Sequence, residues 1–377
     1  MKTVKIILVT ALLFVYTNIV AFADVPDISE HPECSGEAAV LMDGASGRVL
    51  YEKNSHQKLP MASTTKIMTA VTALEYGKLD DIVTIPPEAS GIEGSSIWLS
   101  AGEHHTLEDL LYGLMLRSGN DAAAAIALHI GGSIENFAGM MNDLARKIGA
   151  VDSSFVNPHG LHEENHYTTA YDLALITAYG MRNPDFKTIV STKYRTIPWE
   201  GHEWDRAMKN KNKLLWTYEG ANGVKTGYTK KAGRCFVGSS ERNNLQLITV
   251  VLNCGPMFEE SAALLDYGFK NYKKYDIYNK GELIRSVSVG KGKQDRVPLI
   301  AGKEFAIALK EEEKGRVRKE ILLPESIEAP IAVGIPVGSI KIYFENRLMD
   351  ELPVVTAQAV EKRSIWDFFR KMVNLWR

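Results

Sequence analysis

The sequence predicts an α/β (α+β) first domain, with an antiparallel sheet and a cluster of helices, followed by a small all-β, sandwich-like domain. The chain of 377 residues is longer than one ordinary domain of about 100 to 200 residues. As far as residue 272, apolar residues at helical spacing alternate with strand-like stretches. Beyond that point short alternating stretches are separated by Gly and Pro. We therefore expect a first domain over 24–272 and a second over 273–363.

The N-terminus has the features of a signal peptide. Lys2 and Lys5 precede an apolar stretch over residues 6–20, and Ala21-Phe22-Ala23 supplies an A-x-A cleavage site. We expect residues 1–23 to be removed and the protein to be exported. A retained membrane helix is the alternative for an apolar stretch of this length.

A hairpin and a helix come next along the chain. Residues 37–43 and 48–53 flank the turn G-A-S-G, which predicts two paired strands. Residues 60–72, P-M-A-S-T-T-K-I-M-T-A-V-T, predict a helix whose first turn carries Ser63 and Lys66. Residues three apart share a helical face, so the Lys66 amine can reach the Ser63 hydroxyl. Such a pair is the minimum equipment of a serine nucleophile with a lysine base.

The spacing of this pair is not specific by itself. Ser55 and Lys58 repeat it in a polar stretch that ends at Pro60 and is typical of a turn. Ser63 also suits a structural role, because Ser and Thr are preferred at helix starts. The choice between a helix cap and a nucleophile therefore depends on residues later in the chain.

Residues 106–148 predict three helices. Thr106 and Asp109 resemble a capping box at the start of the first helix. The sequence S-G-N at 118–120 forms a glycine turn before the second helix, where a side chain can point away from the packing. Residues 133–148 carry apolar side chains at helical spacing and predict the third.

The stretch N-P-H-G at 157–160 is rich in turn formers. His159, His162 and His166 have a spacing that metal ligands can have, but no helical pattern or cysteine cluster accompanies them. We expect a solvated loop there, without a metal. Residues 171–181 predict another short helix.

Residues 221–253 predict two antiparallel strands that turn at 241–244, with K-T-G at 225–227 at the head of the hairpin. A helix over 259–270 closes the first domain. At the C-terminus, residues 364–377 place aromatic and apolar side chains on one helical face and polar and charged ones on the other, which favours a helix lying in a membrane surface. A helix docked on the second domain is the alternative.

Composition excludes some kinds of partner. The formal net charge of -2 gives no basic field for nucleic acid, so we expect no nucleic-acid partner. Cys34, Cys235 and Cys254 are too few and too scattered for a disulfide framework. We expect buried thiols, no metal site and no cofactor.

Three short motifs stand in order along the chain: S-T-T-K at 63–66, S-G-N at 118–120 and K-T-G at 225–227. With them the sequence resembles the low-molecular-mass penicillin-binding proteins that are serine-type D-alanyl-D-alanine carboxypeptidases. The resemblance covers the signal peptide, a serine acyltransferase domain of the β-lactamase-like fold, a β-rich second domain and an amphipathic C-terminal anchor. It favours Ser63 as a nucleophile rather than a helix cap.

The resemblance implies a substrate, a location and a set of catalytic residues. The substrate is the peptidoglycan stem peptide ending in D-Ala-D-Ala, β-lactams are covalent inhibitors that mimic it, and residues 364–377 hold the enzyme on the outer face of the cytoplasmic membrane. Ser63 attacks the penultimate carbonyl and forms an ester. Lys66 acts as the base once burial and neighbouring charge keep its amine neutral. Ser118 relays protons to the leaving amine, and Asn120 positions the substrate amide.

The same resemblance implies the substrate-binding residues. Lys225 and Thr226 receive the terminal carboxylate, and Gly227 lets the substrate lie flat against the strand as an added strand. The backbone N–H groups of Ser63 and Tyr228 form the oxyanion hole.

The sequence departs from the family pattern in three places. Gly119 stands where the related motif has Asp, and Tyr228 follows K-T-G where some relatives have His. No arginine occurs over residues 255–263, where some relatives supply a contact to the carboxylate. The mode of deacylation and the full carboxylate anchor therefore stay open.

Other functions remain to be weighed against the carboxypeptidase. A class A β-lactamase needs a Glu followed by Asn four residues later, and this pattern does not occur between residues 120 and 225. A sensor that is acylated without turnover, and a D,D-endopeptidase, share the same motifs and stay as alternatives.

Overall fold

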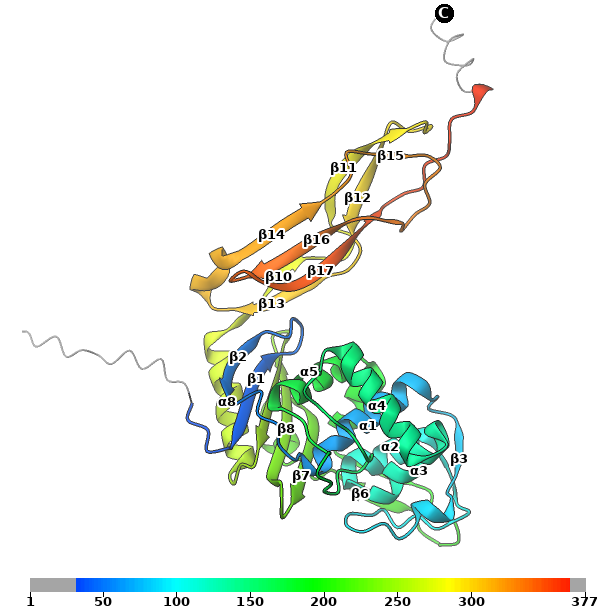
Figure 1. The fold of residues 1–377 in the computed structure, drawn as a ribbon, viewed down its shortest axis with the longest axis vertical. Helices are drawn as coiled ribbons and strands as arrows, with labels where there is room; N and C mark the ends of the chain where they lie inside the picture. The colour runs from blue at the N-terminus through cyan, green and yellow to red at the C-terminus, as the bar shows by residue number, and fades with distance from the viewer. Residues whose placement is uncertain (1–31, 367–377) are drawn as a thin grey trace, which may run out of the picture. The chain divides into compact units, whose positions relative to one another are not determined.

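The computed structural model describes residues 32–366 (Figure 1). The predicted signal peptide lies outside the described residues, and only residues 364–366 of the predicted anchor fall within them. In the part of the chain that the structure describes, no helix is both long and apolar enough to cross a membrane.

A five-stranded antiparallel sheet forms the centre of the first part of the chain (Figure 1). Its order is β2-β1-β9-β8-β7, so β7 lies at an edge. The strands are β1 (Ala38–Asp43), β2 (Val49–Lys53), β7 (Ala221–Thr229), β8 (Gly233–Arg242) and β9 (Leu245–Leu252). The pair β1–β2 confirms the first predicted hairpin, and the pair β8–β9 confirms the turn predicted at 241–244. The stretch before that turn forms two strands, β7 and β8, where the sequence predicted one, so K-T-G lies on β7 and outside the β8–β9 hairpin.

Helices cover both faces of this sheet. On one face, α8 packs Leu264 and Leu265 against Leu41. On the other face α1 to α6 contribute to a core that contains Val40 and Val250. The helices are α1 (Lys66–Tyr76), α2 (Leu107–Tyr112), α3 (Asn120–Gly131), α4 (Ile134–Ile148), α5 (Ala170–Met181), α6 (Pro184–Ser191), α7 (Leu214–Thr217) and α8 (Met257–Asn271). Because β1 is covered on both faces, every residue in it is buried, and its sequence is a continuous apolar run that ends in Asp43.

Side-chain caps fix the starts of several helices. Thr106 Oγ1 accepts from Asp109 N at 3.1 Å at the start of α2, as the sequence predicts. Ser133 Oγ accepts from Asn136 N at 3.1 Å at the start of α4. Two short ribbons accompany the helices: β3 (Ile82–Thr84) pairs with β4 (His104–Thr106), and β5 (Tyr194–Ile197) with β6 (Arg206–Lys209).

The second part of the chain is all β, as predicted, and has its own core. The strands are β10 (Lys273–Tyr278), β11 (Leu283–Gly290), β12 (Arg296–Ala301), β13 (Phe305–Leu309), β14 (Val317–Leu322), β15 (Ser326–Glu328), β16 (Pro336–Phe344) and β17 (Arg347–Thr356). Six of them form a sheet in the order β14-β16-β17-β12-β11-β15, and β10 pairs with β13. The pairs of this sheet are antiparallel except at one edge, where β15 pairs in parallel with β11. Alternate residues of β12, Val297, Leu299 and Ala301, are buried in the core.

Candidate active site

Ser63 lies in a short 3₁₀ turn, η1 (Ala62–Thr65), that runs directly into α1. Two threonines hold this turn: Thr64 Oγ1 donates to Met61 O at 2.6 Å, and Thr65 Oγ1 donates to Ala62 O at 2.8 Å. The local sequence therefore satisfies its own carbonyls and leaves the Ser63 side chain free to face a pocket at the start of the helix.

Lys66, the first residue of α1, is fully buried behind Ser63. Its Nζ lies 3.1 Å from Ser63 Oγ, 2.7 Å from Asn120 Oδ1 and 2.6 Å from His159 O. A neutral amine has two N–H donors and one lone pair. It can therefore donate to the Asn120 and His159 oxygens while its lone pair accepts the Ser63 hydroxyl proton, which uses its whole hydrogen-bonding capacity.

The surroundings favour this neutral form. Burial, and then the positive charges of Lys225 and Lys211, hold the pKa of Lys66 well below its usual value of 10.5. A lysine with an ordinary pKa would be protonated at neutral pH and could not accept a proton. The structure thus places an amine of lowered pKa next to a hydroxyl, an arrangement in which an amine can accept the hydroxyl proton.

The turn that contains Ser118 and Asn120 brings both side chains to the same place. Ser118 connects η3 (Gly113–Arg117) to α3 with a φ of 65°, in the left-handed region. Asn120 is the first residue of α3. Both polar atoms of its side chain are hydrogen-bonded: Oδ1 accepts from Lys66 Nζ, and Nδ2 donates to Glu93 O. Asn120 therefore holds the Lys66 amine in the free enzyme.

Gly227 on β7 faces the Ser63 turn. A Cβ at this position would lie 3.0 Å from Met61 O, 3.0 Å from Thr64 N and 3.1 Å from Ser63 N. Such contacts are tighter than side chains normally make, so only glycine lets β7 approach the turn without displacing it. This close approach sets the distance between the strand and the Ser63 turn.

The other residues of the K-T-G segment differ in exposure. Lys225 is buried, and its Nζ donates to Thr226 O at 2.9 Å. Burial, followed by the charge of Lys211, lowers the pKa of Lys225 to about 7. Thr226 lines the pocket, and Tyr228 is 65% exposed at its rim.

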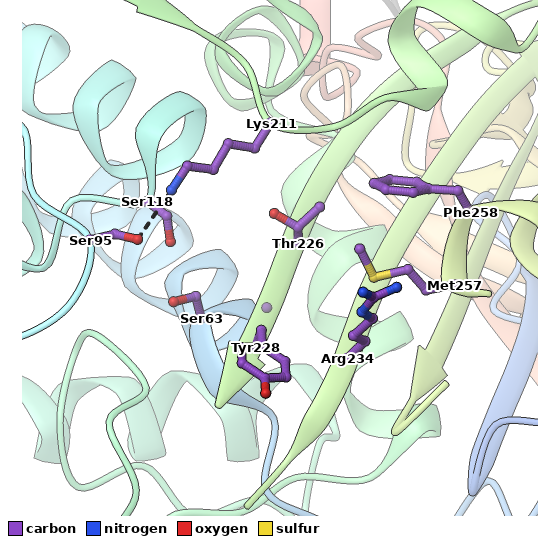
Figure 2. Close-up of a pocket in the computed structure, with 10 residues that line it drawn as sticks. Ser63, Ser95, Ser118, Lys211, Thr226, Tyr228, Arg234, Met257 and Phe258 are labelled. Carbon is purple, nitrogen blue, oxygen red and sulfur yellow. Dashed lines mark hydrogen bonds between the residues drawn. The ribbon is translucent and has the colours of Figure 1, made fainter. Parts of the chain in front are cut away.

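A pocket of about 490 Å³ opens over Ser63 (Figure 2). Its lining joins the three sequence motifs, since Ser63, Ser118 and the Thr226–Tyr228 stretch all contribute, while Lys66, Asn120 and Lys225 are buried behind it. The lining residues are Ser63, Ser95, Ser118, Lys211, Thr226, Gly227, Tyr228, Arg234, Met257 and Phe258.

Sequence reasoning missed the two cations that line this pocket. Lys211 Nζ donates to Ser95 Oγ at 3.1 Å on one wall (Figure 2). Arg234, on the opposite side, pairs in register with Tyr228 across β7 and β8, and its Nη1 donates to Gly255 O at 3.2 Å. The turn K-K-A-G before Arg234 would have revealed this residue, because a hairpin closed there places it opposite Tyr228.

The histidine loop, residues 157–166, is solvated as expected only at 162–165. The expectation is wrong for the rest of the loop, where Asn157, Pro158, Gly160 and His166 are buried. Its carbonyls accept hydrogen bonds from α1: Pro158 O accepts from Thr69 Oγ1 at 2.6 Å, and His159 O accepts from Lys66 Nζ. His166 is buried, with Nε2 2.8 Å from Thr65 Oγ1 and Nδ1 accepting from Val156 N at 3.1 Å. Turn-forming residues predict a loop but not its burial.

Comparison with known proteins agrees with this geometry. Residues 26–255 match the peptidase S11 family model, described as D-alanyl-D-alanine carboxypeptidase, and residues 272–362 match the model of the penicillin-binding protein 5 C-terminal domain. The D-alanyl-D-alanine carboxypeptidase DacF of Bacillus subtilis is 34% identical, over 90% of this chain and 90% of its own. DacC of Escherichia coli is 31% identical, over 97% of this chain and 95% of its own.

The fold gives the same result. The crystal structure of penicillin-binding protein 5 from Haemophilus influenzae superposes with a TM-score of 0.71 at 30% identity, covering 88% of this chain and 99% of that one. The chain therefore belongs to the D-alanyl-D-alanine carboxypeptidase family of penicillin-binding proteins.

Proposed function

We propose that this chain removes the terminal D-alanine from peptidoglycan stem peptides through an acyl-enzyme on Ser63, as a step in maturation of the cell wall. The family acts on peptidoglycan peptides that end in D-Ala-D-Ala and binds β-lactams. The observation that carries the proposal is the buried Lys66 amine of lowered pKa, 3.1 Å from the Ser63 hydroxyl at the floor of a pocket.

Acylation begins when Lys66 Nζ takes the Ser63 proton and Oγ attacks the carbonyl carbon of the penultimate D-alanine. The N–H groups of Ser63 and Tyr228 stabilise the oxyanion, since Gly227 keeps the strand close to the Ser63 turn. The proton then passes by way of Ser118 to the leaving amine, and the peptide bond breaks. Water hydrolyses the resulting ester with Lys66 again as the base, which restores the Ser63 hydroxyl.

The substrate lies along the free edge of β7, where its backbone can pair as an added strand. Its terminal carboxylate is received by the Thr226 hydroxyl together with Arg234, because both line the pocket on the side of Tyr228. Lys225 receives the carboxylate together with Thr226, since its hydrogen bond to Thr226 O leaves other N–H donors available, and its charge also lowers the pKa of Lys66. Arg234 thus supplies the cation that residues 255–263 lack.

The enzyme works at the outer face of the cytoplasmic membrane in this proposal. PBP5-like proteins are typically exported, and residues 1–23 have the pattern of a signal peptide. Residues 364–377 bind the membrane surface by their aromatic face. Ending the chain at residue 363 is then expected to move the protein from the membrane fraction to the soluble fraction without loss of peptidase activity.

The catalytic proposal is tested by incubating the purified protein with a peptide ending in D-Ala-D-Ala. Continuous release of D-alanine is expected, and Ser63→Ala abolishes both this release and covalent labelling by penicillin. Ser55→Ala is the matched control, because Ser55 has the same spacing to a lysine but its Oγ donates to Glu52 Oε2.

Other outcomes point elsewhere. A single stoichiometric burst of D-alanine would assign the protein to the acylated sensors. Cleavage of cross-linked muropeptides without D-alanine release would assign it to the endopeptidases.

A further inference from the structure

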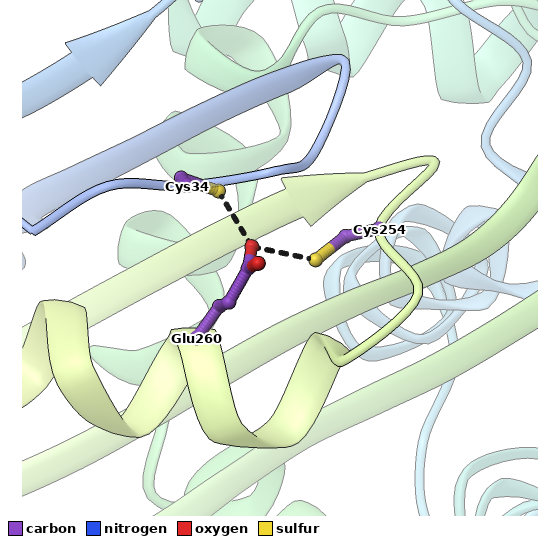
Figure 3. A group of neighbouring side chains, drawn as sticks. All are labelled: Cys34, Cys254 and Glu260. Carbon is purple, nitrogen blue, oxygen red and sulfur yellow. Dashed lines mark hydrogen bonds between the residues drawn. The ribbon is translucent and has the colours of Figure 1, made fainter.

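Cys34 meets Cys254 and Glu260, which lie more than two hundred residues later in the sequence, at one end of the five-stranded sheet (Figure 3). Cys34 lies just before β1, Cys254 follows β9, and Glu260 is in the first turn of α8. The pairing of β1 with β9 is antiparallel and matches Ala38 to Leu252, which brings the two cysteines together.

The side chains converge on a common point. Cys34 Sγ lies 3.1 Å and Cys254 Sγ 2.9 Å from Glu260 Oε2. All three ligand atoms are within 4.8 Å of one another, and both cysteines are buried. Gly36 makes room for this arrangement, since a Cβ there would lie 3.2 Å from Cys254 Cβ and 3.3 Å from Cys34 Sγ.

Neighbouring groups orient the cluster as outer groups do around a metal. Ser35 donates its backbone N–H to Glu260 Oε2 at 3.0 Å and its hydroxyl to Oε1 at 2.5 Å, which fixes the carboxylate. Lys53 Nζ donates to Cys34 O at 2.6 Å and places a positive charge beside the three acidic groups.

We propose that Cys34, Cys254 and Glu260 bind one Zn²⁺ ion, with a water molecule in the fourth position. Two thiolates and a carboxylate are donors that Zn²⁺ accepts in tetrahedral geometry. Each thiol gives up its proton to solvent on binding, so the three ligands carry three negative charges. The ion leaves one of these uncompensated, and Lys53 lies beside it.

Cys235 provides the contrast within the same chain. It is buried, and its Sγ faces the carbonyls of Pro60 and Ala232 at 3.9 and 3.6 Å. Burial raises the pKa of its thiol to about 11. Cys235 therefore stays a protonated thiol and serves as the matched control.

The site lies behind one wall of the catalytic pocket. Gly255, which follows Cys254, accepts the hydrogen bond from Arg234, and Met257 and Phe258 line the pocket. A bound ion ties the segment ahead of β1 to this wall. The inference is independent of the peptidase reaction, because it depends only on the cluster.

The test uses the full chain, freed of metal and kept reduced with a phosphine. Titration with Zn²⁺ against a chromophoric chelator is expected to show one ion per chain, and Co²⁺ is expected to give a thiolate-to-metal charge-transfer band. Cys34→Ser, Cys254→Ser and Glu260→Gln each weaken Zn²⁺ binding by about 100-fold or more. Cys235→Ser binds as the unaltered chain does.

Three results would overturn the site. The first is the absence of the Co²⁺ band in the reduced, unaltered chain, a measurement that needs no variant to fold. The second is equal Zn²⁺ affinity in all the cysteine variants. The third is a Cys34–Cys254 disulfide, found by mass spectrometry of peptides from protein exported in the presence of zinc.

Discussion

A lysine serves as a base at neutral pH only if its environment keeps the amine uncharged. For Lys66 this environment consists of complete burial, two nearby lysines and two oxygen acceptors that use its N–H groups. Acylation is therefore expected to rise with pH along a limb whose midpoint lies below the ordinary lysine pKa of 10.5. Below that midpoint the ammonium form cannot accept the Ser63 proton.

Replacement of Lys66 by Gln removes this base while keeping a polar side chain of similar length. The second-order rate constant for acylation by a β-lactam is expected to fall by about 10² to 10⁴, and its rise with pH is lost. Lys58→Gln is the control, since Lys58 repeats the spacing to a serine but is largely exposed beside Asp152. An unchanged rate in Lys66→Gln would remove the lysine from the mechanism.

Arg234 is expected to act on substrate binding more than on the chemical step. Replacement by Ala raises the KM for a D-Ala-D-Ala peptide by about 10- to 100-fold, as expected for loss of a charged hydrogen bond worth roughly 1.5–3 kcal/mol. Arg234→Lys recovers part of the affinity. Lys230→Ala, which alters an exposed cation of the same turn, leaves KM unchanged.

A modified substrate shows whether Arg234 contacts the terminal carboxylate or only supports the structure of the pocket. For a peptide whose terminal carboxylate is amidated, the unaltered enzyme and Arg234→Ala are expected to have the same KM. If the amidated peptide shows the full difference between the two enzymes, Arg234 does not bind the carboxylate.

The positions of strand β7 and the turn η1 depend on each other, because Gly227 brings their backbones into contact. In Gly227→Ala the new methyl group must displace the Ser63 turn by a few tenths of an ångström. We expect kcat/KM to fall by about 10- to 100-fold, since catalysis is sensitive to small errors in placing the nucleophile and the oxyanion hole. Steady-state kinetics with a peptide substrate measure this effect.

Gly139 in α4 gives the control for this substitution. A Cβ there meets nothing within 4 Å, so Gly139→Ala is expected to leave kcat/KM unchanged and to stabilise the fold by roughly 0.5–1 kcal/mol. Equal kinetics for the two alanine variants would show that the close approach of β7 is unnecessary.

The sequence predicted elements better than it predicted their contacts. Local patterns located the turns of the β1–β2 and β8–β9 hairpins and the cap at Thr106, because turn chemistry and capping act over a few residues, but the β7–β8 hairpin was missed. The parallel pairing of β15 with β11 was missed, since it joins segments with no local signal between them. Arg234 differs, because the turn K-K-A-G before it is a local signal, and a hairpin closed there places Arg234 opposite Tyr228.

In the candidate active site, too, the sequence predicted some residues and left others to be found in the structure. Three short motifs identified Ser63, Ser118 and Lys225, and the fold brings them to one pocket or directly behind it. Lys211 and the carbonyl of His159 carry no motif, and only the folded chain shows that they surround Lys66. The Cys34–Cys254–Glu260 cluster was likewise not predicted, because Cys34 is separated from Cys254 and Glu260 by more than two hundred positions of sequence.

The pKa values of His159 and His166 in the histidine loop make the stability of the fold depend on pH. Burial, with the charges of His159, His162 and Lys66, lowers the pKa of His166 from 6.5 to about 3. Burial and Lys66 also lower the pKa of His159 to about 4. Both rings are neutral in the folded protein at pH 5, whereas the unfolded chain binds protons below pH 6.5. The contribution of these rings to stability is therefore complete above about pH 6.5 and is lost as pH falls towards 3.

For His166 alone, the free energy of unfolding is expected to fall by roughly 1.6 kcal/mol between pH 6.5 and pH 5. His166→Asn lowers stability at pH 7, because it removes the ring that meets Thr65 and Val156. The substitution also makes the free energy of unfolding depend less on pH over this interval. A substitution that only weakened the fold would lower stability equally at both pH values. Urea unfolding of both proteins at the two pH values measures the difference. If the two proteins lose equal stability on acidification, the buried ring is not the group that titrates.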